Sequence, residues 1–368
     1  MTRIRSLCAC LCLTTLATSV ARAQDASAGI QIAPQYVSYK LAAPTSSTIS
    51  EFALPVYVLV PVSNALSFDV GTSFASVQVS QGANASSSIS GLTDTQLRAN
   101  YAIGTDFVVL TAGVNLPTGQ STVRPEQQVA AGVIANDFLV FPISNMGTGL
   151  GGTAGVALAH PLGDWNVGAG VSMRKSAAYT PFQTPDTVPV LRYQPGDEYR
   201  ARVGIDHGVG TGRVSLGLTY STFGDDQLSG SVYNTGDRLI TQFGYNNSLG
   251  TGTLMLSAWD LFRKTGTMAG GAPLGQENVA DGSLGYGFAA GGVVLTPTAE
   301  LRSWTQQGQA ASSLMNLDLR ARWTVAGAFV SPTVGYSAGK VASSGSSTDA
   351  TSNLTGYHAS LGITLTAH

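Results

Sequence analysis

The feature that most constrains the fold is an alternation of apolar and polar residues, which recurs in segment after segment and is clearest at 311–327. One face of that segment carries Met315, Leu317, Leu319, Ala321, Trp323 and Val325, and the other carries Asn316, Asp318, Arg320, Arg322 and Thr324. Because successive side chains of a strand point to opposite faces, this period predicts a strand with one apolar and one charged wall. Repeated runs of about ten such residues favour an all-β, antiparallel transmembrane β-barrel over a sandwich with shorter strands.

The first residues have the pattern of a secretory leader. Arg3 and Arg5 precede a largely apolar stretch at 7–20, and Ala21-Arg22-Ala23 has the form of a cleavage site. The apolar stretch is too short to span roughly 30 Å of hydrocarbon, which argues against a membrane anchor. We therefore predict a signal peptide at 1–23 and a single barrel domain at 24–368. All three cysteines lie in the leader, which excludes disulfides and thiolate chemistry from the mature chain.

Composition supports a surface that faces lipid. Charged residues make up 11% of the chain, against about 25% in typical soluble domains. No uninterrupted apolar run after the leader approaches the length of about 18 residues that a helical span needs. The net charge of −2 gives no basic footprint for nucleic acid. The barrel would thus lie in the bacterial outer membrane.

Alternation and turn residues together predict sixteen strands, with fourteen as the alternative. They are expected near 29–41, 51–62, 65–80, 91–103, 105–116, 149–161, 164–177, 197–207, 211–223, 236–247, 251–263, 277–290, 292–305, 312–326, 328–339 and 353–367. Short connections alternate with long ones, including 81–90 and 117–148. In outer-membrane barrels the short turns are periplasmic and the long loops are outside.

The charged faces are expected to line the lumen, because an arginine on the lipid face at mid-bilayer costs about 2–4 kcal/mol. We predict that the following residues line it and set ionic selectivity: Asp94, Arg98, Glu198, Arg200, Arg202, Glu300, Arg302, Asp318, Arg320 and Arg322. Aromatic residues near strand ends, Trp259 among them, are typical of interfacial girdles, although ordinary loop packing is an alternative.

Three of the predicted strands, near 29–41, 51–62 and 105–116, break the rule that inward positions are polar, which suggests an apolar wall inside the lumen. We expect Tyr57, Leu59, Phe107 and Val109 to line any apolar path. Residues 125–139 form a predicted short amphipathic helix in the longest loop, with Pro125 in its first turn and Glu126 at its positive end. The helix either folds into the lumen against the apolar wall or stays exposed in the loop.

Two short motifs carry a family resemblance. GLTDT at 91–95 and GVNLPTG at 113–119 resemble the paired motifs of outer-membrane barrels of the phenol-degradation meta-pathway family. That family is distantly similar to the channels for fatty acids and hydrocarbons. The resemblance covers roughly residues 90–175 and implies an outer-membrane channel for hydrophobic compounds. The chain departs from the usual pattern in ending with Thr366-Ala367-His368 rather than an aromatic residue.

Catalytic motifs are weak. Gly147, Gly149 and Gly152 match a dinucleotide fingerprint, but alternating residues follow them where the motif requires a helix. The four histidines are scattered and have no metal-binding spacing. A serine hydrolase assembled across neighbouring strands, as in a lipid-modifying barrel enzyme, stays open as an alternative.

The sequence therefore predicts a passive outer-membrane channel for small solutes, including hydrophobic or aromatic compounds, with no catalytic residues, metal or cofactor. Its partners would be outer-membrane lipid, the solutes, the barrel-assembly machinery during biogenesis and, as an open question, further copies of the chain. A lipid-modifying enzyme and a structural or adhesive barrel with a filled lumen are the rival functions.

Overall fold

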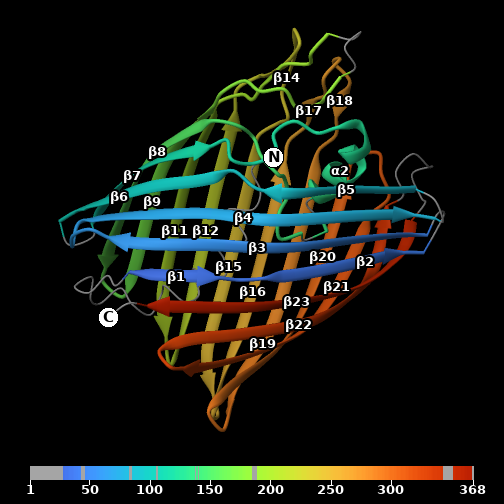
Figure 1. Cartoon of the computed structure of the whole chain (residues 1–368). Coiled ribbons are helices and arrows are strands. Elements are labelled where there is room, and N and C mark those ends of the chain that lie inside the picture. Colours follow the sequence, from blue (N-terminus) through green and yellow to red (C-terminus); the bar gives the residue numbers. More distant parts are fainter. Residues whose placement is uncertain are drawn as a thin grey trace.

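The fold is seen in a computed structural model, which describes residues 28–42, 46–82, 85–104, 107–136, 138–139, 141–184, 189–342 and 351–366. The predicted signal peptide at 1–23 lies outside these residues. Figure 1 shows a single barrel whose strands wrap around one lumen.

The barrel wall is one closed antiparallel sheet of sixteen strands, as predicted, and not of fourteen. The sheet contains eighteen strand segments in the described residues, because β1 and β2 follow each other in one wall position, as do β5 and β6. The segments are β1 (Gly29–Ile32), β2 (Gln35–Leu41), β3 (Ser47–Pro61), β4 (Leu66–Gln81), β5 (Ala85–Leu92), β6 (Thr95–Ile103), β7 (Val108–Leu116), β8 (Gly151–Leu162), β9 (Trp165–Ser176), β11 (Glu198–Val209), β12 (Gly212–Phe223), β15 (Arg238–Leu249), β16 (Gly252–Arg263), β19 (Glu277–Ala290), β20 (Val293–Gln306), β21 (Ser312–Val325), β22 (Ala328–Ala342) and β23 (Thr351–Thr366). Pairing of β1 and β2 with β23 closes the cylinder.

The two ends of the barrel differ as the sequence predicts. Short turns such as 62–65, 210–211 and 291–292 connect strands at one end, and longer segments connect them at the other. Two small sheets lie in these longer segments: β10 (Tyr193–Gln194) with β13 (Asp226–Leu228) and β14 (Ser231–Tyr233), and β17 (Gly266–Thr267) with β18 (Pro273–Leu274). The ends are hereafter the turn end and the loop end.

The predicted long loop at 81–90 is wrong. Residues Ala85–Leu92 instead form β5, which pairs with β4 from Gln81 opposite Ala85 to Phe74 opposite Leu92. The outward positions of β5 include three exposed serines, Ser86, Ser88 and Ser90. This strand therefore lacks the apolar face by which the other strands are recognised.

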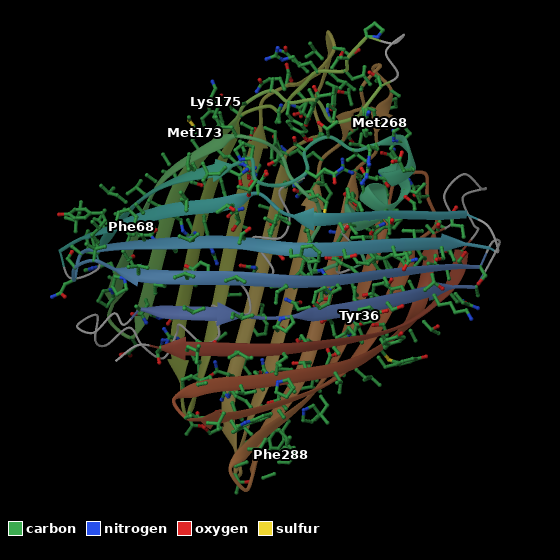
Figure 2. The ribbon with its side chains drawn as sticks, viewed as in Figure 1. Tyr36, Phe68, Met173, Lys175, Met268 and Phe288 are labelled. Atoms are coloured by element: carbon green, nitrogen blue, oxygen red, sulfur yellow. The ribbon has the colours of Figure 1, made fainter. Side chains whose placement is uncertain are left out.

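The outer face of the wall is an apolar belt. Directly opposite residues of neighbouring strands lie on the same face of the sheet. The register therefore assigns each strand residue around the barrel to the inner or the outer face. Large side chains stay exposed on that face, including Phe68, Phe74, Leu301, Leu319 and Val334. Figure 2 shows Phe68, Met173 and Phe288 at the outside of the ribbon. Such a belt suits contact with lipid acyl chains.

Candidate functional site: the lumen and its inner loop

The longest loop folds into the barrel, the first of the two arrangements that the sequence allowed. It contains the 3-10 helix η1 (Pro125–Gln127) and the α-helix α2 (Gln128–Ile134). A single buried apolar cluster joins the loop to the inner wall. Its loop members are Ala130, Ile134, Phe138, Leu139, Phe141, Ile143 and Met146; its wall members are Val37, Tyr39, Ile49, Ala53, Ala75, Val77, Val79, Ile89, Leu314 and Leu354. The loop thus covers the apolar part of the wall.

Helix α2 lies against β5 and β4 (Figure 1). Ala130 and Ile134 are buried on one side of the helix, and Val129 is 45% exposed on the other. Ser87 of β5 fixes the helix start, because its hydroxyl donates to the Glu126 carbonyl over 2.6 Å and accepts from the Ala130 amide over 3.2 Å. Apolar packing and these two hydrogen bonds fix the position of the helix.

Asp94 holds both ends of the inner loop. Its carboxylate accepts hydrogen bonds from the Gly119 amide at 3.1 Å, the Thr148 amide at 2.6 Å and the Asn115 side chain at 2.8 Å. Gly119 leaves no room for a side chain, because a Cβ atom there would lie 2.6 Å from the Asp94 amide nitrogen. The GLTDT and GVNLPTG motifs therefore contact each other and form the clamp from which the loop enters the lumen.

The Thr93–Asp94 step is also a bulge in the wall. Phe74 pairs with Leu92 and Gly71 pairs with Gln96, so the strand carrying Asp94 has one residue more than β4 over this stretch. An extra residue reverses the alternation of faces. Leu92 and Leu97 can both face outward as a result, while Asp94 points at the loop.

A buried glutamate meets the middle of the loop. Glu51 of β3 is fully buried, and its Oε1 atom accepts a hydrogen bond from the Ile143 amide at 2.8 Å. Its Oε2 atom has no hydrogen-bond partner among the described residues. The strand pattern does not single out Glu51, because its role depends on a contact with a residue 92 positions away.

A charged layer lies beside the loop. Arg302 is buried; its Nε atom is 2.9 Å from Asp281 and its Nη2 atom is 2.8 Å from Glu300. Its Nη1 atom donates to the Phe138 carbonyl of the loop over 3.3 Å. The guanidinium also lies 5.3 Å from the ring centre of Trp259. Trp259 therefore belongs to the inner face, and its assignment to an outer girdle is wrong.

Two other ion pairs on the inner wall involve charged residues of the predicted set. Arg98 pairs with Asp69 at 2.8 Å, and Asn100 donates to the same carboxylate at 2.9 Å. Arg200 pairs with Glu198 at 2.5 Å. Asp69, which the strand pattern did not single out, could have been found as the cross-strand neighbour of Arg98.

The remaining charged residues lie on β11 and β21. Asp318 is 2.6 Å from Nε2 of His358 on β23. Arg202 donates a hydrogen bond of 3.3 Å to the side chain of Gln242. Arg320 and Arg322 pair across the sheet with Thr296 and Val294, and neither forms an ion pair among the described residues. The register places nine of the ten predicted residues on the inner face, and Asp94, between β5 and β6, points at the inner loop.

The predicted apolar residues are less closely grouped. Tyr57 and Leu59 face Gly71 and Asp69 across β3 and β4, whereas Val109 lies on β7, with β4 and β6 between. Phe107 precedes β7 in a turn and contacts the ring of His160 edge-on at 5.4 Å between centroids. The structure brings Tyr57 and Leu59 together, but it does not bring Phe107 or Val109 to them.

The inner wall therefore has two halves. The covered half runs from β20 through β23 and β1 to β5 and contacts the loop. The uncovered half runs from β7 to β19 and carries arginines on β9, β11, β12, β15 and β16. A solute that passes the loop without displacing it would follow the uncovered half.

No helix among the described residues is long and apolar enough to cross a membrane. A closed antiparallel barrel with an apolar outer belt, charges turned inward and long connections at one end defines a membrane-spanning β-barrel of the outer-membrane class. Its lumen, with the inner loop, is the candidate site of a channel.

No family model matches the chain, and no curated protein is similar to it in sequence. The resemblance to the phenol-degradation meta-pathway family thus stays a prediction. Similar solved structures include an anion-selective porin from Comamonas acidovorans, with 14% identity, a TM-score of 0.42 and coverage of 93% of this chain and 99% of that one. The TodX monoaromatic hydrocarbon channel has 8% identity, a TM-score of 0.47 and coverage of 93% and 91%. An outer-membrane channel from Pseudomonas putida has 13% identity, a TM-score of 0.37 and coverage of 93% and 96%.

Proposed function

We propose that this protein is a passive outer-membrane channel in which the inner loop narrows the lumen to a polar route along β7–β19. The observation that carries the proposal is the division of the inner wall. The loop buries the apolar residues of one half in the cluster around Phe138, and the other half keeps charged side chains facing the lumen. In a structural barrel with a filled lumen, arginines without acidic partners would be buried at a desolvation cost.

Arginines without an acidic partner define the preferred solutes. Arg202 lies on β11 in the uncovered half, and Arg320 and Arg322 lie near the turn end of β21 in the covered half. None of the three forms an ion pair among the described residues, so the lumen is expected to favour small anions. Hydrophobic or aromatic solutes would contact Tyr57 and Leu59, which lie toward the turn end of β3. Diffusion down a gradient needs no cofactor.

The test is conductance in planar bilayers, with the wild-type chain beside a variant in which residues 121–145 are replaced by a short Gly-Ser linker. If the loop narrows the route, the linker variant should conduct several-fold more than wild type and admit larger solutes. Uptake of charged and aromatic solutes into proteoliposomes would then rank the solute classes.

The matched control replaces residues 265–275, a loop-end connection outside the apolar cluster, with a linker of the same kind. Its conductance should equal that of wild type. Absence of conductance in both the wild-type chain and the 121–145 variant would reject the channel and favour a filled barrel.

A further inference from the structure

The loop end of the uncovered half holds a cluster of charged side chains, called here the mouth cluster. It consists of Arg174, Glu198, Arg200, Arg238, Arg263 and Glu277. Cross-strand pairing places Arg174 beside Glu198, Arg238 beside Arg263, and Arg263 beside Glu277. Ser221 pairs with both Arg200 and Arg238 and connects the two groups. The six side chains therefore form one row around the inner wall.

Both carboxylates of the mouth cluster already have partners. Glu198 pairs with Arg200 at 2.5 Å. Glu277 pairs with Arg263 at 2.9 Å and accepts a hydrogen bond of 2.7 Å from the Trp304 indole. Four guanidinium groups thus face two carboxylates, and each carboxylate lies against its own arginine.

Arg238 is left without an anionic partner. The side chain is only 8% exposed, its Nε atom is buried without a hydrogen-bond partner, and it forms no ion pair within the described part of the chain. One face of the guanidinium lies 4.9 Å from the ring centre of Phe223. Its cross-strand neighbour is Arg263, a like charge.

This arrangement is costly unless something balances it. Glu198 and Glu277 attract Arg238 only through space, so the buried charge is desolvated without a carboxylate that hydrogen-bonds to it. Like charges directly opposite each other on a sheet are also destabilising. A guanidinium carries five N–H donors in a planar fork that matches the two oxygens of a carboxylate. Phe223 covers one face of this fork.

We propose that Arg238, with Arg200 two strands away on the other side of Ser221, binds the carboxylate group of a small organic acid at the loop end of the lumen. Arg200 is partly exposed and Arg202 is exposed on the same face of β11, so the two would guide the anion along the wall to Arg238. This site deepens the proposed function, because it names carboxylate-bearing solutes as the class that the channel takes. The bound carboxylate would balance the surplus positive charge of the mouth cluster.

The experiment is isothermal titration calorimetry on the purified full chain in detergent, with potassium benzoate or potassium acetate at fixed ionic strength. Both should bind the wild-type chain saturably. Arg238→Gln should weaken benzoate binding by about tenfold or more, and Arg238→Lys should weaken it too, because an ammonium group keeps the charge but not the bidentate fork. Arg192→Gln, which removes the same charge from an exposed loop-end position, is the matched control and should bind as wild type does.

The proposal is overturned if benzoate gives no saturable heat with wild type or binds Arg238→Gln as tightly as wild type. It is also overturned if Arg192→Gln weakens binding equally, which would mean general electrostatic attraction, or if chloride displaces benzoate as well as acetate does. Heat-modifiable migration on gels checks that each variant folds. If Arg238→Gln does not fold, benzoate binding by Arg238→Lys tests the proposal. Binding without conductance would reject the channel but keep the site, whereas conductance without binding would reject the site alone.

Discussion

The covered and uncovered halves of the inner wall share one strand pattern on the outside and differ entirely on the inside. Outward positions are apolar in both, because both face lipid. Inward, the covered half presents Val77, Val79 and Ile89 to the loop, whereas the uncovered half presents Arg200 and Arg238. Apolar side chains in a water-filled lumen would forgo roughly 25 cal/mol for each Å² left unburied. The apolar inward residues of β4 and β5 are therefore stable because the inner loop covers them.

The largest expected effect comes from removing the centre of the apolar cover. Phe138 is 1% exposed and its carbonyl meets Arg302. Phe138→Ala should lower the free energy of unfolding by about 3–5 kcal/mol and raise channel conductance, because the loop would leave the covered half. Urea unfolding in detergent and bilayer recordings measure the two effects.

Val129→Ala is the matched control for this prediction. Val129 lies on the exposed side of helix α2 in the same loop, so its truncation should leave both readouts near wild type. Equal effects of the two substitutions would mean that the loop is not held by packing against the wall.

A smaller effect is expected at the clamp. Asp94→Asn keeps the shape of the side chain but replaces one carboxylate oxygen by an amide that cannot accept hydrogen bonds. Hydrogen bonds to charged groups contribute about 1.5–3 kcal/mol, so the variant should lose about that much stability. The loop should also become accessible to protease added from the loop end.

Asp164→Asn makes the same change in a turn at the opposite end of the barrel, where the side chain is exposed. It should not alter stability or cleavage. If Asp94→Asn leaves the loop as protected as wild type, the contacts between the two motifs do not hold it in place.

The wall was predictable because lipid imposes the same rule on nearly every strand. All sixteen strand positions follow from alternation. The apolar wall made an inward helix one of two alternatives, and the exposed alternative stayed open until the structure placed the helix in the lumen. Residues 85–90 of β5 were not predicted as a strand, because Ser86, Ser88 and Ser90 occupy the outward positions there. A face of serines gives no alternating apolar signal.

Long-range contacts were not predictable. Asp94 was expected among selectivity residues, but the structure shows it bound to Gly119 and Thr148 of the loop. The isolation of Arg238 is a property of its neighbours, and local sequence does not show which carboxylates are already paired. Alternation assigns a residue to a face of the wall and does not identify its partners.

A third prediction concerns ion selectivity near the turn end of β21. Arg320→Gln with Arg322→Gln removes two positive charges that have no ion pair among the described residues. Two unit charges 4 Å apart in water interact by about 1 kcal/mol, so the anion-to-cation permeability ratio should fall by a few-fold. Reversal potentials under a salt gradient measure the ratio.

Lys340→Gln and Lys175→Gln together are the charge-matched control. Both lysines are exposed and lie near the loop end, away from Arg320 and Arg322. An unchanged permeability ratio in the double arginine variant would reject the proposed pore-lining role of Arg320 and Arg322. An equal change in the control would assign selectivity to net charge alone.

The smallest expected effect is a pH dependence at the rim of the uncovered half. Asp237 accepts hydrogen bonds from Tyr220 at 2.7 Å, Thr222 at 2.8 Å and Lys264 at 3.1 Å. These bonds, that of Tyr220 foremost, hold the pKa of the Asp237 carboxyl below its usual value. A carboxyl whose pKa is lower in the folded state stabilises the fold above its unfolded pKa of about 3.9, and that contribution is lost as pH falls further toward the folded pKa.

Thermal unfolding of wild type and Asp237→Asn between about pH 6 and pH 2 measures this contribution. The wild-type chain should be the more stable at the upper end, by well under about 1 kcal/mol because the site is solvent-screened, and the difference should vanish as the carboxylate is protonated. Asp225→Asn alters a nearby carboxylate with a single hydrogen bond of 3.3 Å to Asn234 and should show little pH dependence. A wild-type advantage that persists or grows at the acid end would mean that the ionised carboxylate does not stabilise the rim.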